Sequence, residues 1–411
     1  MTEVTSLLSP TTAASAPPDL AARRLGDYPG SAPGPTVVAI GALHGNEPAG
    51  PAAVRAVFER LERERPAFAG RLIGLRGNRR ALAAGARYLA RDLNRSWAHE
   101  ALAAVVAGGR ASAPEDLELA ELVAEIAPLL ADAREPVVFL DLHSTSAPGT
   151  PFVCMSDVLR NRRIAFALPV PVLLGIEEAL EGSLMGYFTE LGHVAVAIEG
   201  GQHDDEATVS RLEAAIWLAL VATGCLAERD VPGLAGARAL LARAAEGQPR
   251  VLEVRERHPV HPMDGFQMKP GFRNLDRVRR GERLAADVRG EIRARESGFV
   301  LMPLYQSQGS DGFFLARPVR PFWLRVSARL RRWRADRWLI ALPGVRRDPE
   351  ERDRLLVDPR VARFQTINLF HLLGYRRVLE RGDRLVFSRR RPGHRGVAPL
   401  ELEEEPGSGE R

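Results

Sequence analysis

The sequence predicts an α/β fold: a mixed, mostly parallel sheet flanked by helices, then a small β-rich domain and an α/β C-terminal extension. Two observations support this prediction. Between residue 34 and about residue 230, apolar strand-like runs alternate with segments of helical periodicity, which is typical of a parallel sheet covered by helices. The strand-like runs are continuously apolar rather than alternating, as expected for strands that are buried on both faces.

Each element of this region has a local signature. The strand candidates are short apolar runs, and they occupy residues 36–42, 71–77, 135–145 and 192–201. The helix candidates occupy residues 50–65, 114–133 and 205–227. The helix at 114–133 begins with acidic residues, which suit the positive end of the helix dipole.

Changes in composition divide the chain into five segments. Residues 1–33 are rich in Ser, Thr, Ala and Pro and are predicted to form a flexible N-terminus. Residues 34–245 form the predicted α/β domain. Residues 246–320 are glycine-punctuated and strand-rich, which predicts a β-rich cap domain. Residues 321–395 form an arginine-rich C-terminal extension, and residues 396–411 form an acidic tail that is predicted to be disordered.

Net charge and cysteine content restrict the binding partners and the cellular location that the sequence predicts. The net charge is +5, but Lys269 is the only lysine, and this arginine bias is better explained by genome composition than by phosphate contacts. A nucleic-acid partner is therefore disfavoured. Only two cysteines are present, and the N-terminus lacks a secretory pattern, so a reducing, cytoplasmic location is predicted. The longest apolar run is too short to span a bilayer, and no membrane partner is expected.

Polar side chains follow three of the strand candidates. His44 and Glu47 lie in "HGNE" after the first strand, His143 lies in "DLHST", and Glu199 lies in "IEGG". Ligands of parallel sheets gather beyond the carboxyl ends of the strands. Two imidazoles and one carboxylate are a typical catalytic zinc set with one open position, and zinc makes bound water a usable nucleophile near neutral pH. Glu199 is then a candidate to accept a proton from that water.

The stretch "RYLARDLNR" adds a second polar cluster at residues 87–95. Arginine binds carboxylates with two parallel hydrogen bonds, so Arg87 or Arg95 could hold a substrate carboxylate, and a second arginine could stabilise an oxyanion. Each motif by itself also has an ordinary explanation. His44 could be a loop histidine, and the arginine cluster could be a solvated loop with salt bridges.

The four motifs together resemble the succinylglutamate desuccinylase/aspartoacylase family, which is similar to the zinc carboxypeptidases in fold and metal site. The resemblance covers roughly residues 35–320. It implies that His44, Glu47 and His143 bind one Zn²⁺ per chain. Asp141, two residues before His143, is a candidate to orient an imidazole from outside the ligand set.

The resemblance also implies catalytic and substrate-binding roles. Glu199 matches the glutamate that acts first as general base and then as general acid. Arg87 matches the arginine that polarises the scissile carbonyl, and Asn94 and Arg95 match the pair that holds the substrate carboxylate. The chain departs from aspartoacylases in "EGGQHDD" at residues 199–205, and it carries Phe313–Phe314 where they place a tyrosine.

The implied activity is zinc-dependent hydrolysis of the amide bond in a small N-acyl amino acid or a related carboxylate-bearing amide. Two alternatives remain open: a zinc carboxypeptidase that acts on short peptides, and a non-catalytic metal-binding interaction module. The expected partner is a small-molecule substrate, and a homo-oligomer is left open.

Overall fold

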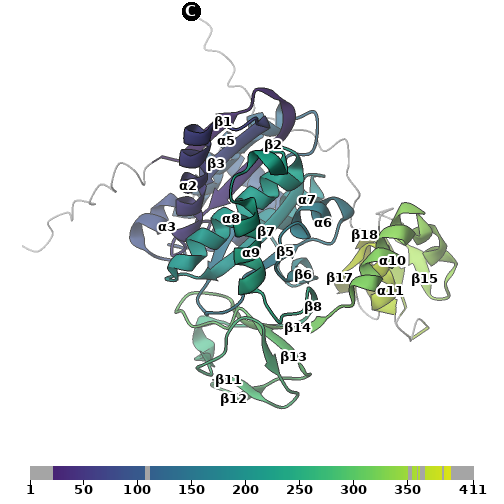
Figure 1. Cartoon of the computed structure of the whole chain (residues 1–411). Helices are drawn as coiled ribbons and strands as arrows, with labels where there is room; N and C mark the ends of the chain where they lie inside the picture. Colours follow the sequence, from purple (N-terminus) through teal and green to yellow (C-terminus); the bar gives the residue numbers. More distant parts are fainter. Residues whose placement is uncertain are drawn as a thin grey trace, which may run out of the picture.

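The computed structural model describes residues 22–106, 112–349, 354–358, 360–361, 366–381 and 384–389. An eleven-stranded mixed sheet organises the molecule (Figure 1). Its strands are, in spatial order, β1 (Arg24–Pro29), β3 (Ala69–Arg76), β2 (Ala32–Gly41), β4 (Val138–Thr145), β7 (Val194–Gln202), β5 (Phe152–Met155), β6 (Val172–Leu174), β8 (Val251–Pro259), β14 (Asp311–Pro318), β13 (Gly298–Leu301) and β10 (Asp276–Val278). The predicted α/β class and its four strand candidates are confirmed.

Helices cover both faces of the sheet. The α-helices of this region are α2 (Ala49–Glu64), α3 (Arg79–Ala84), α4 (His99–Val106), α5 (Pro114–Ala131), α6 (Leu159–Ala165), α7 (Leu184–Glu190), α8 (Glu206–Thr223) and α9 (Leu234–Ala244). Helices α2, α6, α8 and α9 contribute to one hydrophobic core, whereas α4, α5 and α7 contribute to a second core. Figure 1 shows α2, α8 and α9 in front of the sheet. Among the described residues, no helix is long and apolar enough to cross a membrane.

The alternation of side chains along each strand explains these two cores. Val37 and Ala39 of β2 face the first core, whereas Val38 and Ile40 face the second core. Strands β3, β2, β4 and β7 run parallel to one another, so their carboxyl ends lie at one edge of the sheet. This edge carries the loop that contains His44 as well as the ends of β4 and β7.

The N-terminal prediction needs a correction. Residues 24–29 were expected to be flexible, but they form β1, which pairs antiparallel with β3. The neighbouring Arg23 is buried, and its guanidinium forms an ion pair with the buried carboxylate of Glu118 on α5. These long-range contacts stabilise a segment whose composition is typical of a flexible terminus. Residues 1–21 lie outside the described residues.

The predicted β-rich region of residues 246–320 contributes to two sheets. Strands β8, β14, β13 and β10 extend the main sheet, while β9 (Gln267–Met268), β11 (Arg283–Asp287) and β12 (Gly290–Arg293) form a separate three-stranded sheet. A third hydrophobic core lies between these strands. The main sheet contains strands from both sides of residue 245, so the sheet itself does not locate a domain boundary there. That boundary remains a prediction.

The C-terminal extension contains its own antiparallel sheet. Its elements are α10 (Pro321–Arg332), β15 (Val345–Arg347), β16 (Arg354–Val357), α11 (Thr366–Leu373), β17 (Tyr375–Arg381) and β18 (Arg384–Arg389). The four strands pair in the order β15-β16-β18-β17 around a fourth hydrophobic core. Short 3₁₀ turns complete the fold at η1 (Leu93–Arg95), η2 (Ile176–Glu178), η3 (Glu228–Asp230), η4 (Pro262–Asp264) and η5 (Ala335–Ala341). The predicted disordered tail at residues 396–411 lies outside the described residues.

Candidate metal centre and active site

The turn after β2 presents two side chains from one short loop. Ala42 has a φ of 60°, and the Glu47 N–H donates to the His44 carbonyl at 3.2 Å, so the chain reverses within a few residues. A Cβ on Gly45 would lie 2.1 Å from the Ala81 carbonyl carbon, which makes glycine necessary at this close approach. The Gly45 N–H donates to the Arg87 carbonyl at 2.9 Å, and this bond attaches the turn to the segment that carries Arg87.

Strand register brings the other two groups together. His143 on β4 is the direct register partner of Glu199 on β7, and neighbours in a parallel pair point to the same face. Asp141 precedes His143 by two residues and shares this face. The sheet therefore places a carboxylate, an imidazole and a second carboxylate side by side, beneath the turn that carries His44.

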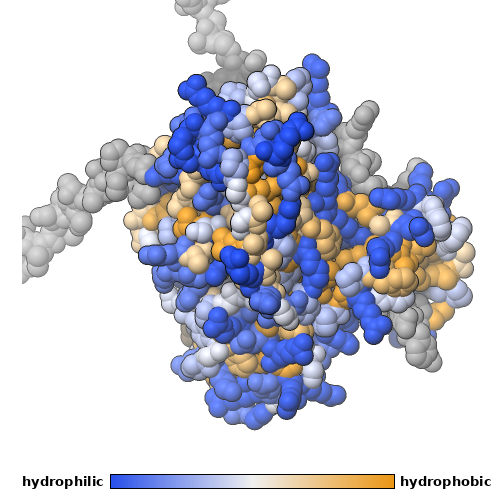
Figure 2. Space-filling view, viewed as in Figure 1, coloured by the Kyte–Doolittle hydropathy of each residue, from blue (hydrophilic) through white to orange (hydrophobic). Residues whose placement is uncertain are grey.

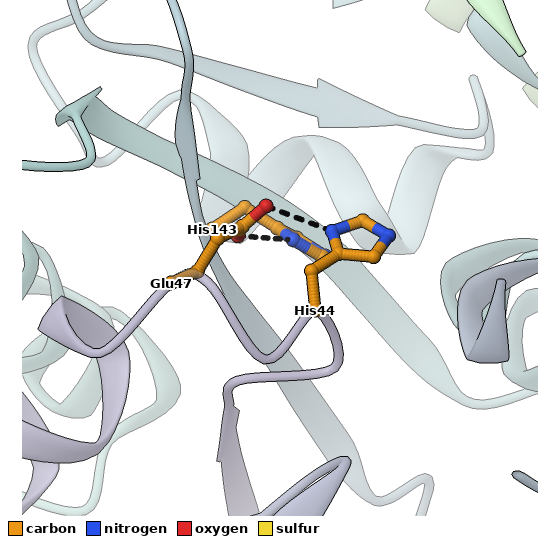
Figure 3. Close-up of side chains that lie close together, drawn as sticks. All are labelled: His44, Glu47 and His143. Carbon is orange, nitrogen blue, oxygen red and sulfur yellow. Dashed lines mark hydrogen bonds and ion pairs between the residues drawn. The ribbon is translucent and has the colours of Figure 1, made fainter. Parts of the chain in front are cut away.

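His44, Glu47 and His143 converge on one point (Figure 3). Their potential ligand atoms lie within 4.8 Å of one another, and all three side chains are buried. His44 Nδ1 lies 2.8 Å from Glu47 Oε1, and His143 Nδ1 lies 3.0 Å from Glu47 Oε2. The two Nδ1 atoms and the Glu47 carboxylate are therefore the donor set that would hold a cation.

Each imidazole also contacts a second carboxylate through its other nitrogen. His44 Nε2 lies 3.0 Å from Asp92 Oδ1, and His143 Nε2 lies 2.9 Å from Asp141 Oδ1. The His143–Asp141 contact has the distance of an ion pair without the alignment of a hydrogen bond. Carboxylates placed in this way fix the orientation and tautomer of metal-binding histidines. The residues thus fit a divalent cation.

The electrostatics of the cluster favour positive charge at its centre. Burial by itself would raise the pKa of Glu47, but the neighbouring His44 and His143 outweigh it and hold that pKa well below its usual range. Burial would lower the pKa of His143, but Asp141 and Glu47 raise it well above its usual range. A site that stabilises a buried imidazolium in this way is also suited to a metal cation.

Glu199 has the properties of a proton carrier. Burial raises the pKa of its carboxyl group to about 8, with smaller contributions from the nearby Glu47 and Asp141. Its Oε2 is buried and has no hydrogen-bond partner among the described residues. A buried carboxyl group with a pKa near neutrality can both accept and donate a proton under physiological conditions.

The "RYLARDLNR" segment surrounds the metal-binding cluster. The Arg87 Nη2 atom lies 3.3 Å from Asp92 Oδ2 and 3.0 Å from His44 Nε2. Asn94 is buried: its Nδ2 lies 3.3 Å from His143 Nε2, and its Oδ1 accepts the Leu184 N–H. Arg95 forms an ion pair with Asp311 of β14 at 3.0 Å. All seven predicted site residues therefore line one cavity.

Comparison with known proteins agrees with this geometry. Residues 33–223 match the succinylglutamate desuccinylase/aspartoacylase catalytic domain. This segment, which contains all seven predicted site residues, therefore resembles the catalytic domain of that family. The resemblance supports a deacylase, that is, an enzyme that hydrolyses amides. No curated protein sequence matches the chain significantly.

Solved structures of this family share the fold. A succinylglutamate desuccinylase/aspartoacylase from Rhodobacter sphaeroides is 20% identical with a TM-score of 0.52, and the match covers 70% of this chain and 87% of that chain. The succinylglutamate desuccinylase from Chromobacterium violaceum is 18% identical with a TM-score of 0.51, over 73% and 95%. An aspartoacylase family protein from Mesorhizobium loti is 19% identical with a TM-score of 0.50, over 72% and 88%.

Several residues that contact the site were not identified as such from the sequence motifs. Asp92 lies within "RYLARDLNR", but its contact with His44 spans 48 positions of the chain, and Asp311 lies more than 200 positions from its partner Arg95. The apolar part of the cavity comes from scattered positions, namely Cys154, Ile176, Leu180, Met185, Ala197, Met302, Leu304 and Phe314. Sequence proximity could not have revealed these contacts.

The segments in which the chain departs from aspartoacylases lie partly inside and partly outside the cavity. His203 contacts Ser144 Oγ at 2.8 Å and Gln306 Oε1 at 3.1 Å, and it lines a neighbouring hollow. Phe314 lines the cavity, whereas Phe313 stacks on His258 in the β-rich region. Among the described residues, no second group of three metal-binding side chains is found.

Proposed function

We propose that the protein is a zinc-dependent hydrolase that cleaves the amide bond of a small N-acyl amino acid or a related carboxylate-bearing amide. The observation that carries the proposal is the shared cavity of His44, Glu47 and His143 with Glu199. A pure binding site has no need for a buried carboxyl group poised to exchange a proton. This argues against the non-catalytic alternative.

In the proposed reaction, His44, Glu47 and His143 would hold a zinc ion, which when bound would polarise the carbonyl group and acidify water. Glu199 accepts a proton from the attacking water and then donates it to the leaving nitrogen, so one water is consumed for each acid and amine released. Arg87 donates hydrogen bonds to the carbonyl oxygen as negative charge develops there.

Asn94 and Arg95 are proposed to hold the substrate carboxylate. Arg95 presents a guanidinium group whose position is fixed by Asp311, and a fixed guanidinium loses little freedom when it binds a second carboxylate. The Arg95 guanidinium would then bind both the substrate carboxylate and Asp311. Because Asp311 lies on β14, the Arg95–Asp311 ion pair connects substrate binding to the β-rich region.

The walls of the cavity favour small substrates over long peptides. Segments of the β-rich region between Met302 and Phe314 line the same cavity as the metal-binding cluster. A carboxypeptidase must admit an extended chain, and these segments narrow the approach. Hydrolysis of long peptides at rates comparable to those of N-acyl amino acids would favour the carboxypeptidase alternative.

The test combines metal analysis with a substrate screen. Purified protein loaded with zinc is offered a panel of N-acyl amino acids, and free amine is measured. Glu199→Gln should retain stoichiometric zinc and lose at least about 1,000-fold in kcat, because both proton transfers depend on this carboxyl group. Glu256→Gln is a matched control, because burial also raises the pKa of that carboxyl group, which lies outside the cavity. Near-wild-type turnover by the Glu199 variant would refute the assignment.

A further inference from the structure

The first helix of the C-terminal extension is anchored by its inner face. Arg331 Nη2 contacts Asp157 Oδ2 at 2.7 Å, and Ser327 Oγ donates to the Leu372 carbonyl at 2.7 Å. Arg162 donates to the Leu324 carbonyl at 2.9 Å. Positions 324, 327 and 331 follow helical spacing, so they define one stripe of α10. The opposite stripe of α10 therefore faces solvent.

This outer stripe combines aromatic and cationic side chains. Phe322 is 55% exposed and Trp333 is 68% exposed. Arg325, Arg329 and Arg332 lie between them, and all five residues line one shallow groove. The Arg329 guanidinium lies 6.0 Å from the centre of the Trp333 ring. An outer face with large apolar side chains is unusual for a helix whose inner face is already packed.

Further exposed hydrophobic side chains continue this surface along the chain. Trp323 and Trp338 are 50% and 75% exposed, and Ile340 and Leu342 are 45% and 40% exposed. The chain has five tryptophans, and the other two are buried. Figure 2 shows hydrophobic side chains gathered over the C-terminal extension, with hydrophilic side chains around them. Exposed hydrophobic patches of this kind mark interaction surfaces.

The charge of this surface has one sign. Between residues 320 and 349, eight of nine arginines are exposed, and the ninth is the anchored Arg331. The two acidic residues of this range, Asp336 and Asp348, are both buried. Acidic residues follow in the sequence at 350–353, outside the described residues. Within the described range, the exposed charge is entirely positive.

We propose that this arginine–tryptophan surface, defined as the exposed residues between 320 and 342, docks on anionic phospholipid bilayers. Arginines bind lipid phosphates, and tryptophan and phenylalanine rings insert at the level of the headgroups. Aliphatic side chains such as Ile340 and Leu342 gain from burial in acyl chains but have no ring to stack on nucleic-acid bases. This proposal differs from the sequence-based expectation of no membrane partner.

The test uses the full-length protein and vesicles of defined composition. The protein should co-sediment with vesicles of phosphatidylglycerol and phosphatidylcholine at low ionic strength. It should bind vesicles of pure phosphatidylcholine much more weakly. Tryptophan emission should shift to the blue on binding, because Trp323, Trp333 and Trp338 would leave water. Trp97 and Trp217 are already buried and contribute little to that shift.

Two sets of variants probe the two parts of the surface. The triple variant Arg325→Gln, Arg329→Gln and Arg332→Gln should bind anionic vesicles on the order of 100-fold more weakly, given the usual contribution of each arginine at such a surface. The triple variant Arg273→Gln, Arg279→Gln and Arg280→Gln on the β-rich region is the matched control and should bind like wild type. Trp333→Ala and Trp338→Ala should each weaken binding by about tenfold.

The outcomes are distinguishable. Circular dichroism and vesicle-free amide hydrolysis should be unchanged in all variants, because these residues lie outside the catalytic cavity. Absence of binding to anionic vesicles, or equal binding by the arginine variant, would overturn the proposal. Tighter binding to RNA or DNA than to vesicles would reassign the surface to nucleic acid. Concentration-dependent dimerisation abolished by Trp333→Ala, without vesicle binding, would reassign it to a second copy of the chain.

Discussion

Glu115 connects the helix packing of this protein to its active site. Its side chain is fully buried at the start of α5. Oε1 accepts the Leu89 N–H at 2.7 Å, and Oε2 accepts the N–H groups of Ala90 and Arg91 at 3.2 and 3.3 Å. This carboxylate therefore fixes the backbone immediately before Asp92, on the loop that carries Asn94 and Arg95.

The effect of a Glu115→Gln substitution on the free energy of unfolding can be estimated from these contacts. The amide keeps one acceptor oxygen, but its NH₂ group must face N–H donors that the second oxygen had satisfied. Hydrogen bonds to charged groups contribute about 1.5–3 kcal/mol each. The side chains of residues 89–91 are exposed, so water can partly replace the lost acceptor. We expect a loss of about 2 kcal/mol in the free energy of unfolding.

The activity of this variant should fall as well. Displacement of catalytic or substrate-binding groups by about 1 Å can cost up to about 100-fold in rate, so we expect kcat/KM to fall by about tenfold with zinc retained. Urea unfolding and amide hydrolysis measure the two effects. Glu59→Gln is the control, because Glu59 is an exposed residue of α2 that does not line the cavity. If Glu115→Gln matches wild type in both measurements, the loop is not held by this carboxylate.

Three further predictions follow from the site and the fold. Asp92→Asn should weaken zinc affinity by about 10- to 100-fold, measured by competition with a chelator, because His44 loses the carboxylate that orients it. N-acyl amino acids with an uncharged acyl group should be hydrolysed faster than N-succinyl analogues, whose acyl group carries a second carboxylate. Apart from the histidines, Arg87 and Arg95 are the only cations among the described cavity residues, and each already contacts a carboxylate of the protein. Faster hydrolysis of N-succinyl substrates would contradict this prediction. His193 accepts the Val137 N–H, and burial lowers its pKa to about 4, so the unfolded chain binds a proton more readily between pH 6.5 and 4. The free energy of unfolding should therefore fall as pH drops through this range, and His193→Asn should make that fall shallower.

The success of the sequence-based interpretation depended on local patterns. Apolar runs and helical periodicity identified β2, β3, β4 and β7 and the helices α2, α5 and α8, because each pattern repeats within a few residues. The short strands β5 and β6 escaped this approach, since runs of four and three residues carry little periodic signal. β1 also escaped it, because its order depends on pairing with β3 and on the ion pair of Arg23.

The sequence by itself determined which chemical groups the protein offers: a turn with an imidazole and a carboxylate, two strand ends with His143 and Glu199, and an arginine-rich C-terminus. Only the tertiary structure decided how these groups meet. Strand register placed Glu199 beside His143, β14 delivered Asp311 to Arg95, and the packing of α10 left its aromatic stripe exposed. The physical reason is that each local pattern depends on neighbours a few residues apart, whereas pKa shifts, cavities and exposed surfaces arise from groups brought together across the whole chain.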